Sequence, residues 1–361
     1  MIPYGRQNII KDDIKSVLNV LKSDFLTQGP VTPKFENEIE KYCEVKHAVA
    51  VVNATSALHL ACLSLGVEKG DIVWTSPISF VASANCAIYC GARVDFVDID
   101  AKTFNICKIS LENKLKVAKK LGKLPKVLIV VHLGGLPCEL EEIRKLSSKY
   151  KFKIIEDASH AFGAKYKSKP IGSCQFSDIT VFSFHPVKII TTAEGGIATT
   201  NNRKIAERLI RDRSHGITRN KKSFEKVYKN EIWNYQQIDL GFNYRMSDIH
   251  AALGISQLKK LEEFIYRRHE IADFYNSELS AMGISLPHQN VKTYSSYHLY
   301  PIRVSKKKGG INQRKLFDYL RGNNIGVNLH YIPIYRHPYF RELGFKKGYC
   351  EEAEKHFKEV I

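Results

Sequence analysis

The sequence predicts an α/β protein with a mostly parallel central sheet, helices on both faces and a smaller C-terminal α+β domain. Short apolar runs alternate with helical apolar spacing from about residue 48 to residue 183, which is typical of parallel sheets. Polar side chains follow several of these runs, at the sheet edge where open α/β folds bind ligands. The runs that predict strands are residues 48–52, 71–75, 94–99, 127–131, 153–155, 179–183 and 195–200.

Helices are expected where apolar residues recur at a spacing of three and four. This pattern predicts helices over residues 12–22, 33–42, 53–65, 140–150, 201–212, 247–279 and 312–321, and another that opens within residues 76–85. Residues 213–240 look irregular. We expect three parts: an N-terminal arm (1–34) that joins the small domain or the active site, a large domain (35–246), and a small C-terminal domain (247–361) that includes residues 299–304 and 327–331.

The composition excludes several classes of protein. The 361 residues are 44% hydrophobic and 25% charged. No apolar run approaches the ~20 residues of a membrane helix, and the N-terminus has no apolar signal-peptide core. Eight cysteines are scattered, and only Cys86 and Cys90 are close. We therefore expect a reduced, cytoplasmic protein without structural disulfides, zinc or another metal.

The net charge of +18 fits either a nucleic-acid-binding protein or an enzyme for an acidic small molecule. The basic residues are spread along the chain, with clusters at residues 219–222 and 306–308. No zinc-finger, RNP or helix-turn-helix pattern accompanies them. We therefore expect no nucleic-acid partner, and we expect some of these charges to steer an anionic substrate such as a nucleotide sugar.

Lys188 is set apart by its position. The apolar run 179–183 leads into a loop that presents this lysine, and Glu194 and two glycines follow. A lysine just past a buried strand is easily desolvated and loses its proton, and a neutral amine forms a Schiff base with a carbonyl group. A lone lysine at a strand end is more often a plain surface residue. Other candidate residues are therefore needed to distinguish a Schiff-base lysine from a surface lysine.

Other candidate residues lie near the ends of predicted strands or the starts of helices. Asp157 follows a buried strand, and Thr55 and Ser56 open a helix whose free N–H groups suit a phosphate. Ser183 ends the strand before the lysine loop, and Phe80 is placed to stack on a flat ring. Each has an ordinary alternative, as a turn carboxylate, a helix cap or a core aromatic residue.

Together these residues supply what pyridoxal 5′-phosphate (PLP) needs. Lys188 would hold the cofactor and act as general base and acid, and Asp157 would keep the pyridine nitrogen protonated. We expect PLP as the cofactor, with pyridoxamine phosphate as an intermediate. The chain contains neither a Walker loop nor a G-x-G-x-x-G pattern, which argues against a nucleotidase or a nicotinamide enzyme.

These residues belong to segments that resemble the DegT/DnrJ/EryC1/StrS sugar aminotransferases, which are fold-type I PLP enzymes with the aspartate aminotransferase-like fold. The likeness runs from residues 26–30 to residues 331–333. The other matching segments are residues 53–58, 79–85, 131–133, 156–160, 182–188, 194–196 and 241–246.

The resemblance implies roles for single residues. Lys188 would bond the cofactor, Asp157 would pair with the pyridine nitrogen, and His160, where many members carry glutamine, would lie near the ring hydroxyl. Asn243 would reach the phosphate of the neighbouring subunit's cofactor, which implies a homodimer with shared active sites. The phosphate and ring contacts would be Thr55, Ser56, Ser183 and Phe80. The expected substrate contacts are Tyr4, Thr27, Gly29, His185 and His330.

Within the family, several sequence segments resemble those of the transaminases of the pseudaminic acid pathway. They are residues 76–81, 189–196, 213–216, 298–302 and 330–335. The resemblance implies transfer of an amino group from L-glutamate to C4 of a UDP-linked 4-keto-6-deoxy-N-acetylhexosamine. The alternatives are another nucleotide-sugar 3- or 4-aminotransferase, a catalytically silent PLP-binding regulator, and a basic nucleic-acid-binding protein without enzyme activity.

Overall fold

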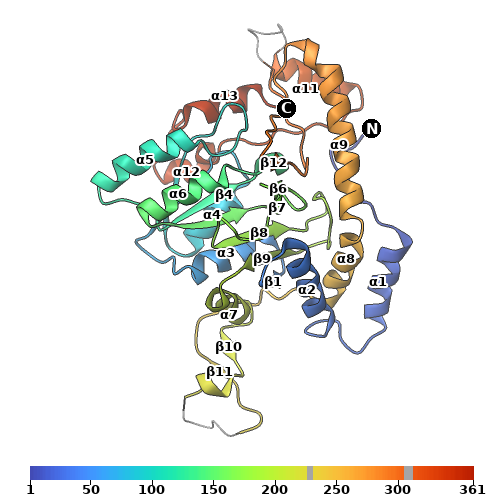
Figure 1. The fold of residues 1–361 in the computed structure, drawn as a ribbon, viewed down its shortest axis with the longest axis vertical. Coiled ribbons are helices and arrows are strands. Elements are labelled where there is room, and N and C mark those ends of the chain that lie inside the picture. The colour runs from blue at the N-terminus through green and yellow to red at the C-terminus, as the bar shows by residue number, and fades with distance from the viewer. Residues whose placement is uncertain (226–230, 305–311) are drawn as a thin grey trace.

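The computed structural model describes residues 1–225, 231–304 and 312–361. Within them, seven strands form a central sheet covered by helices (Figure 1). The order across this sheet is β1-β9-β8-β5-β4-β2-β3. The strands are β1 (His47–Val51), β2 (Ile72–Thr75), β3 (Arg93–Phe96), β4 (Val127–Val131), β5 (Lys153–Asp157), β8 (Ile179–Ser183) and β9 (Gly196–Thr200).

The sheet is mostly parallel, as predicted. Strands β8, β5, β4, β2 and β3 run in the same direction, and β9 lies antiparallel between β8 and β1. Each predicted strand of this sheet is present, and β4 and β8 have the predicted bounds. The sequence-based fold class is therefore confirmed.

The alternation of side chains along each strand separates the core into two layers. Leu128 and Val130 of β4 belong to the core shared with α2 (Val31–Cys43), α5 (Lys108–Lys120) and α6 (Leu140–Tyr150). Val127 and Ile129 belong to the opposite core, shared with α3 (Ala54–Ser64), α4 (Ala82–Tyr89) and α7 (Arg203–Asp212). A side chain's place in its strand therefore fixes the layer that it enters.

The arm helix α1 (Lys11–Leu21) packs on α8 (Asp248–Leu258). The prediction of one helix over residues 247–279 is wrong, because Lys259 and Lys260 separate α8 from α9 (Leu261–Leu279). The buried carboxylate of Asp13 accepts hydrogen bonds from Gln257 at 2.8 Å and from Lys260 at 2.9 Å. Where α8 ends, the side chains of Gln257 and Lys260 therefore both reach the carboxylate of Asp13.

The C-terminal part contains η3 (Ser280–Met282), α11 (Gln313–Gly322), η4 (Ile334–Arg336), α12 (Pro338–Glu342) and α13 (Glu351–Glu359). Residues 299–304 and 327–331 lie outside the named strands, and Arg303 instead makes single bridges to Ser285 and Val360. A small sheet joins β12 (Thr293–Tyr294) to β6 (Lys165–Tyr166), which also pairs with β7 (Lys169–Pro170).

A short hairpin of β10 (Ile217–Thr218) and β11 (Gln236–Gln237) projects from the body (Figure 1). It occupies part of the region that the sequence analysis left irregular. The remaining short elements are η1 (Leu133–Gly135) and η2 (Lys221–Ser223). The basic cluster at residues 306–308 lies outside the described residues. Across the described residues, every helix is too short or too polar to span a bilayer.

Candidate active site

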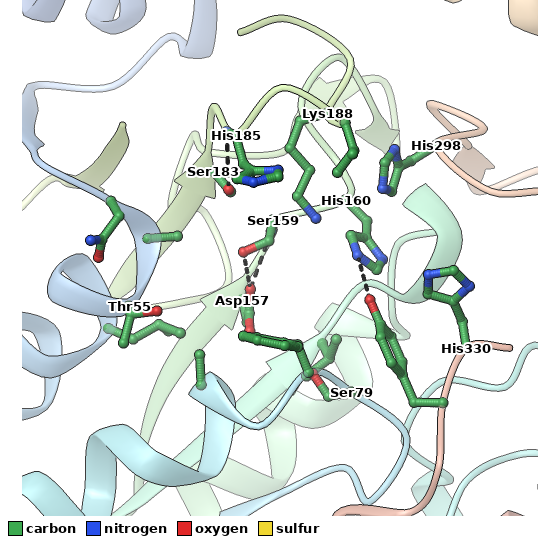
Figure 2. Close-up of a pocket in the computed structure, with 18 of the residues that line it drawn as sticks. Thr55, Ser79, Asp157, Ser159, His160, Ser183, His185, Lys188, His298 and His330 are labelled. Atoms are coloured by element: carbon green, nitrogen blue, oxygen red, sulfur yellow. Dashed lines mark hydrogen bonds between the residues drawn. The ribbon is translucent and has the colours of Figure 1, made fainter. Parts of the chain in front are cut away.

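A cavity of about 340 Å³ lies at the carboxyl ends of β4, β5 and β8. Alternation along these strands sends Val131, Asp157 and Ser183 to the sheet face that carries α3 and α4. Most of the predicted site residues line this one cavity (Figure 2). They are Tyr4, Thr55, Phe80, Asp157, His160, Ser183, His185, Lys188 and His330.

Lys188 is held by a loop that folds back on the end of β8. The carbonyl oxygen of Phe184 accepts hydrogen bonds from Thr192 N at 2.9 Å and from Thr191 Oγ1 at 3.0 Å. The N–H of Lys188 donates to His185 O at 2.8 Å. Burial lowers the pKa of Lys188 to about 8, against the opposing effect of the Asp157 charge. A neutral amine is therefore available close to physiological pH.

Three donors hold the carboxylate of Asp157, which is 5% exposed. Ser159 donates its hydroxyl at 2.6 Å and its N–H at 3.2 Å to Oδ1, and Ser83 donates its hydroxyl at 2.6 Å to Oδ2. The hydroxyl of Ser79 lies 2.7 Å from that of Ser83. Hydrogen bonds to a carboxylate stabilise its charged form. Asp157 is thus fixed in place beside the cavity.

His160 faces Lys188 from the loop after β5 (Figure 2). Its Nδ1 accepts the N–H of Gly134 at 3.3 Å, so Nε2 carries the ring proton and donates to Tyr331 Oη at 3.2 Å. Burial, and then the positive charge of Lys188, lower the pKa of His160 well below 6.5. His160 is therefore a neutral donor at physiological pH.

The first turn of α3 forms another wall, to which Asn53, Ala54 and Thr55 contribute. Asn53 caps this helix by accepting the N–H of Ser56 at 2.8 Å. Gly196 lets β9 approach the turn closely, because a Cβ at that position would lie 2.4 Å from the carbonyl carbon of Asn53. The first turn of a helix offers unpaired N–H groups that suit a phosphate.

Four predicted site residues lie outside the cavity lining. Ser56 is buried behind the first turn of α3, and Asn243 makes a single bridge to Ser214. Thr27 bridges to Ser247, and Gly29 packs against Phe25 and Asp248. None of these four residues therefore lines the cavity of the described chain, although Ser56 directly follows Thr55, which does.

Sequence reasoning missed several residues at the cavity. Ser159 lies in residues 156–160, and Ser79 and Ser83 lie in residues 79–85, which are segments that resemble the family. No sequence pattern distinguished their hydroxyl groups from those of other serines. His298 lies inside the quoted segment 298–302, and it lines the cavity with 8% of its surface exposed. Their roles depend on contacts between distant parts of the chain, which the sequence does not show.

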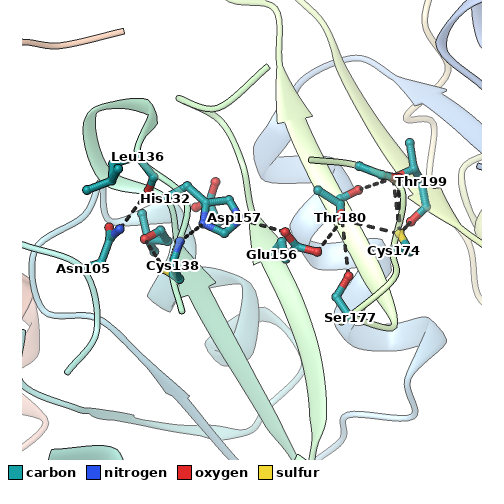
Figure 3. Close-up of polar contacts among 12 residues, drawn as sticks. Asn105, His132, Leu136, Cys138, Glu156, Asp157, Cys174, Ser177, Thr180 and Thr199 are labelled. Carbon is teal, nitrogen blue, oxygen red and sulfur yellow. Dashed lines mark hydrogen bonds and ion pairs between the residues drawn. The ribbon is translucent and has the colours of Figure 1, made fainter. Parts of the chain in front are cut away.

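The opposite face of β5 carries a second polar network (Figure 3). Nδ1 of His132 accepts the N–H of Cys138 at 3.0 Å, so Nε2 carries the proton and donates to Glu156 Oε2 at 2.7 Å. Thr180 Oγ1 donates to the other Glu156 oxygen at 3.0 Å. Glu156 precedes Asp157, so this network fixes the end of β5 from behind.

Comparisons with known proteins agree with this architecture. The model of the DegT/DnrJ/EryC1/StrS aminotransferase family matches residues 7–361. The UDP-4-amino-4,6-dideoxy-N-acetyl-beta-L-altrosamine transaminase of Campylobacter jejuni is 41% identical over 346 residues, which cover 95% of this chain and 87% of that protein.

Solved structures show the same fold. Helicobacter pylori PseC, an aminotransferase of pseudaminic acid biosynthesis, has a TM-score of 0.88 and 33% identity, over 99% of this chain and 92% of that chain. A putative sugar aminotransferase from Streptococcus pneumoniae, in its pyridoxamine phosphate form, has a TM-score of 0.89 and 29% identity, over 100% and 93% of the two chains. It is also known in a PLP form. The chain therefore belongs to the DegT/DnrJ/EryC1/StrS aminotransferase family and is a PLP-dependent aminotransferase.

Proposed function

We propose that this protein transfers the amino group of L-glutamate to C4 of a UDP-linked 4-keto-6-deoxy-N-acetylhexosamine. The observation that carries the proposal is the joint position of Lys188 and Asp157 in one cavity. An amine with a pKa of about 8 and a clamped carboxylate are the two groups that PLP chemistry requires.

The other lining residues fit the remaining parts of PLP. Hydroxyl groups and the first turn of α3 suit its phosphate, and Phe80 suits the face of its ring. We assign Thr55, Ser56 and Ser183 to the phosphate, Asp157 to the pyridine nitrogen and His160 to the ring hydroxyl. Bound PLP would supply an electron sink and would carry the amino group between the two substrates.

Lys188 has two tasks in this proposal. It holds the cofactor at rest, and after its release its amine moves a proton to and from the substrate carbon. General acid–base catalysis of this kind is worth about 10²–10⁴-fold in rate. The lowered pKa of Lys188 suits this role, because near neutral pH both protonation states of the amine are accessible.

We further propose a homodimer in which Asn243 contacts the cofactor of the partner subunit. Asn243 lies outside the cavity of its own chain, so a role at the cofactor requires a second copy. It lies close in sequence to the projecting β10–β11 hairpin, where Ile232, Trp233 and Leu240 are 91%, 73% and 80% exposed. Exposed apolar groups of this size are typical of surfaces that another protein covers.

The sugar assignment rests on the relatives in the pseudaminic acid pathway, since the Campylobacter relative is named for the altrosamine product. The net charge of +18 also suits a substrate with a diphosphate. An alternative is another nucleotide-sugar 3- or 4-aminotransferase, because the similar structures include a sugar aminotransferase whose name gives no pseudaminic acid pathway. Figure 2 shows the basic groups that any such substrate would meet, among them His185, Lys188 and His330.

The test is to incubate the PLP-loaded protein with L-glutamate and a panel of UDP-4-keto and UDP-3-keto sugars. NMR then identifies the aminated product and its configuration. Amination at C4 of the altrose-series substrate is expected, and Lys188→Ala should abolish it while Lys120→Ala, an exposed position on α5, should not. Amination of a different keto-sugar would support the alternative, and no amination of any sugar would refute both.

A further inference from the structure

His298 lies in a segment that two parts of the protein hold firmly. Leu299 N donates to Gly134 O and Ser296 N to Gly135 O, each at 3.1 Å. From the other side, Nη1 of Arg268 on α9 donates to the carbonyl oxygens of Tyr297 at 2.9 Å and His298 at 3.3 Å. The backbone of His298 therefore has a fixed position at the cavity wall.

The side chain of His298 is buried and unsatisfied. Nδ1 has no hydrogen-bond partner among the described residues, although the residue is only 8% exposed. Of the buried side-chain polar atoms without a partner in the described chain, only this one belongs to a residue that lines the cavity. A buried unpaired polar group costs about 1–3 kcal/mol, and such groups usually mark a function. The missing partner is therefore expected in a ligand.

The surroundings of His298 favour an anion. In the view of Figure 2, His160, His298 and His330 lie to one side of the Lys188 amine and Asp157 lies to the other. Burial, and then the positive charges of Lys188 and Arg268, lower the pKa of His298 well below 6.5. The imidazole is therefore neutral in the free cavity, and a bound carboxylate would favour its protonated form.

The two substrates make different demands on this wall. Glutamate brings two carboxylates, whereas the reacting part of a hexose brings hydroxyl groups and no charge. A permanently charged side chain would be buried without a partner when the sugar is bound, and burying an unpaired charge costs free energy. A histidine can pair with a carboxylate as a cation and with a hydroxyl as a neutral group.

We propose that Nδ1 of His298 binds a carboxylate of the amino-group donor. This proposal rests on the proposed function, because it takes L-glutamate as the donor. Other titratable or charged groups also face this space and contribute to any protons taken up on binding. In the cavity lining they are Tyr4, Asp157, His160, His185, Lys188, Glu194, His330 and Tyr331, and Arg268 acts on His298 from outside the lining.

The test compares three variants in the cofactor-loaded protein. His298→Phe keeps a ring but removes both nitrogens, His298→Asn keeps a polar group near the position of Nδ1 without a titratable site, and His288→Phe is a matched control at an exposed histidine. Rapid mixing with L-glutamate alone gives the apparent Kd of the donor half-reaction. Titration calorimetry with glutarate, in two buffers of different ionisation heat, gives its affinity and the number of protons taken up.

His298→Phe should weaken glutamate and glutarate roughly 10- to 100-fold, as loss of a hydrogen bond to a charged group does. Proton uptake should fall in both His298 variants, and His298→Asn should retain part of the affinity. His288→Phe should match the wild type, and PLP affinity should change less than about threefold throughout.

Unchanged glutarate affinity in His298→Phe, or unchanged proton uptake in both His298 variants, would overturn the proposal. A parallel loss of PLP affinity would also overturn it, because Nδ1 would then serve the cofactor. A wild type that binds glutamate but aminates no sugar would refute only the proposed sugar substrate. A wild type that binds neither glutamate nor glutarate would refute both proposals.

Discussion

The hydroxyl of Ser83 on α4 donates a 2.6 Å hydrogen bond to Oδ2 of Asp157 on β5. Ser83→Ala removes this donor and leaves Ser79 without its partner at 2.7 Å. Because a hydrogen bond to a charged group contributes about 1.5–3 kcal/mol, we expect a stability loss of that size and a roughly tenfold lower kcat. Urea denaturation and steady-state kinetics measure the two effects.

The matched control is Ser64→Ala, since the Ser64 hydroxyl donates only to Ala61 O within α3. It should leave kcat unchanged. If Ser83→Ala and Ser64→Ala lost the same small amount of stability and neither lost activity, Ser83 would have no part in holding Asp157.

Asp157→Asn keeps the size of the side chain and removes its charge. We expect a decrease in kcat/KM on the order of 10²–10⁴-fold with a normal fold, as for loss of an essential catalytic group. The charge of Asp157 raises the pKa of Lys188, so its removal should lower that pKa below about 8. The pH dependence of lysine labelling by mass spectrometry, on cofactor-free protein, gives the shift. An upward shift would contradict the proposed charge interaction.

Lys188 should make the stability of the cofactor-free protein depend on pH. Its pKa falls from 10.5 to about 8 on folding, so between these values the unfolded chain binds more protons and stability rises with pH. Below pH 8 both states are protonated, and burial of the charge costs up to about 3 kcal/mol. Lys188→Met should therefore be more stable than the wild type at pH 7, and the difference should shrink towards pH 10. Urea denaturation across this range checks it, and a constant difference would refute the lowered pKa.

The Glu156 network behind the sheet predicts losses of stability of different size for two substitutions (Figure 3). Glu156→Ala leaves the buried Nε2–H of His132 without an acceptor and should cost roughly 2–5 kcal/mol of stability. In Glu156→Gln, the amide oxygen can accept from His132 while its NH₂ donates to Thr180, whose hydroxyl rotates, so the loss should be about 1 kcal/mol. Thermal and urea unfolding compare the two. Equal losses would show that the glutamine amide cannot take the place of the carboxylate between His132 and Thr180.

Shared active sites predict complementation between two inactive variants. Lys188→Ala and Asn243→Ala should each be inactive or weak alone. When they are unfolded and refolded together, half of the dimers are mixed and half of the sites in those are complete, so roughly a quarter of wild-type activity should return. Activity that stays at the level of the separate variants would refute the role of Asn243 in the partner's site.

Much of the fold follows from local patterns. Val127–Val131 and Leu140–Tyr150 have the predicted bounds, because a buried apolar run and a regular helical spacing are local signals. α5 was not predicted, although Leu111, Leu115 and Ala118 lie on one buried face. The break between α8 and α9 could not be predicted, because it depends on contacts of Gln257 and Lys260 with Asp13, which is more than 240 positions away.

The candidate site likewise contains some residues that local sequence patterns reveal and others that they do not. Lys188, Asp157 and Thr55 lie beside strand and helix ends that local patterns reveal, and the structure brings them to one cavity. Ser83 and His298 matter only through atoms of distant segments, so nothing local distinguishes them from ordinary core residues. The division into domains at residues 34 and 246 stays a prediction.

The contacts around Gly134 and Gly135 have a consequence for biosynthesis. Ser296 Oγ donates to the carbonyl oxygen of His160, 136 positions earlier, and His298, His330 and Tyr331 line the same cavity, so part of its wall is translated long after the lysine and the aspartate. A nascent chain that has emerged only through β9 has its lysine and aspartate but lacks the segment that encloses them. The cavity that would hold the coenzyme is therefore completed only near the end of synthesis, so loading with the coenzyme has to follow translation of nearly the whole chain.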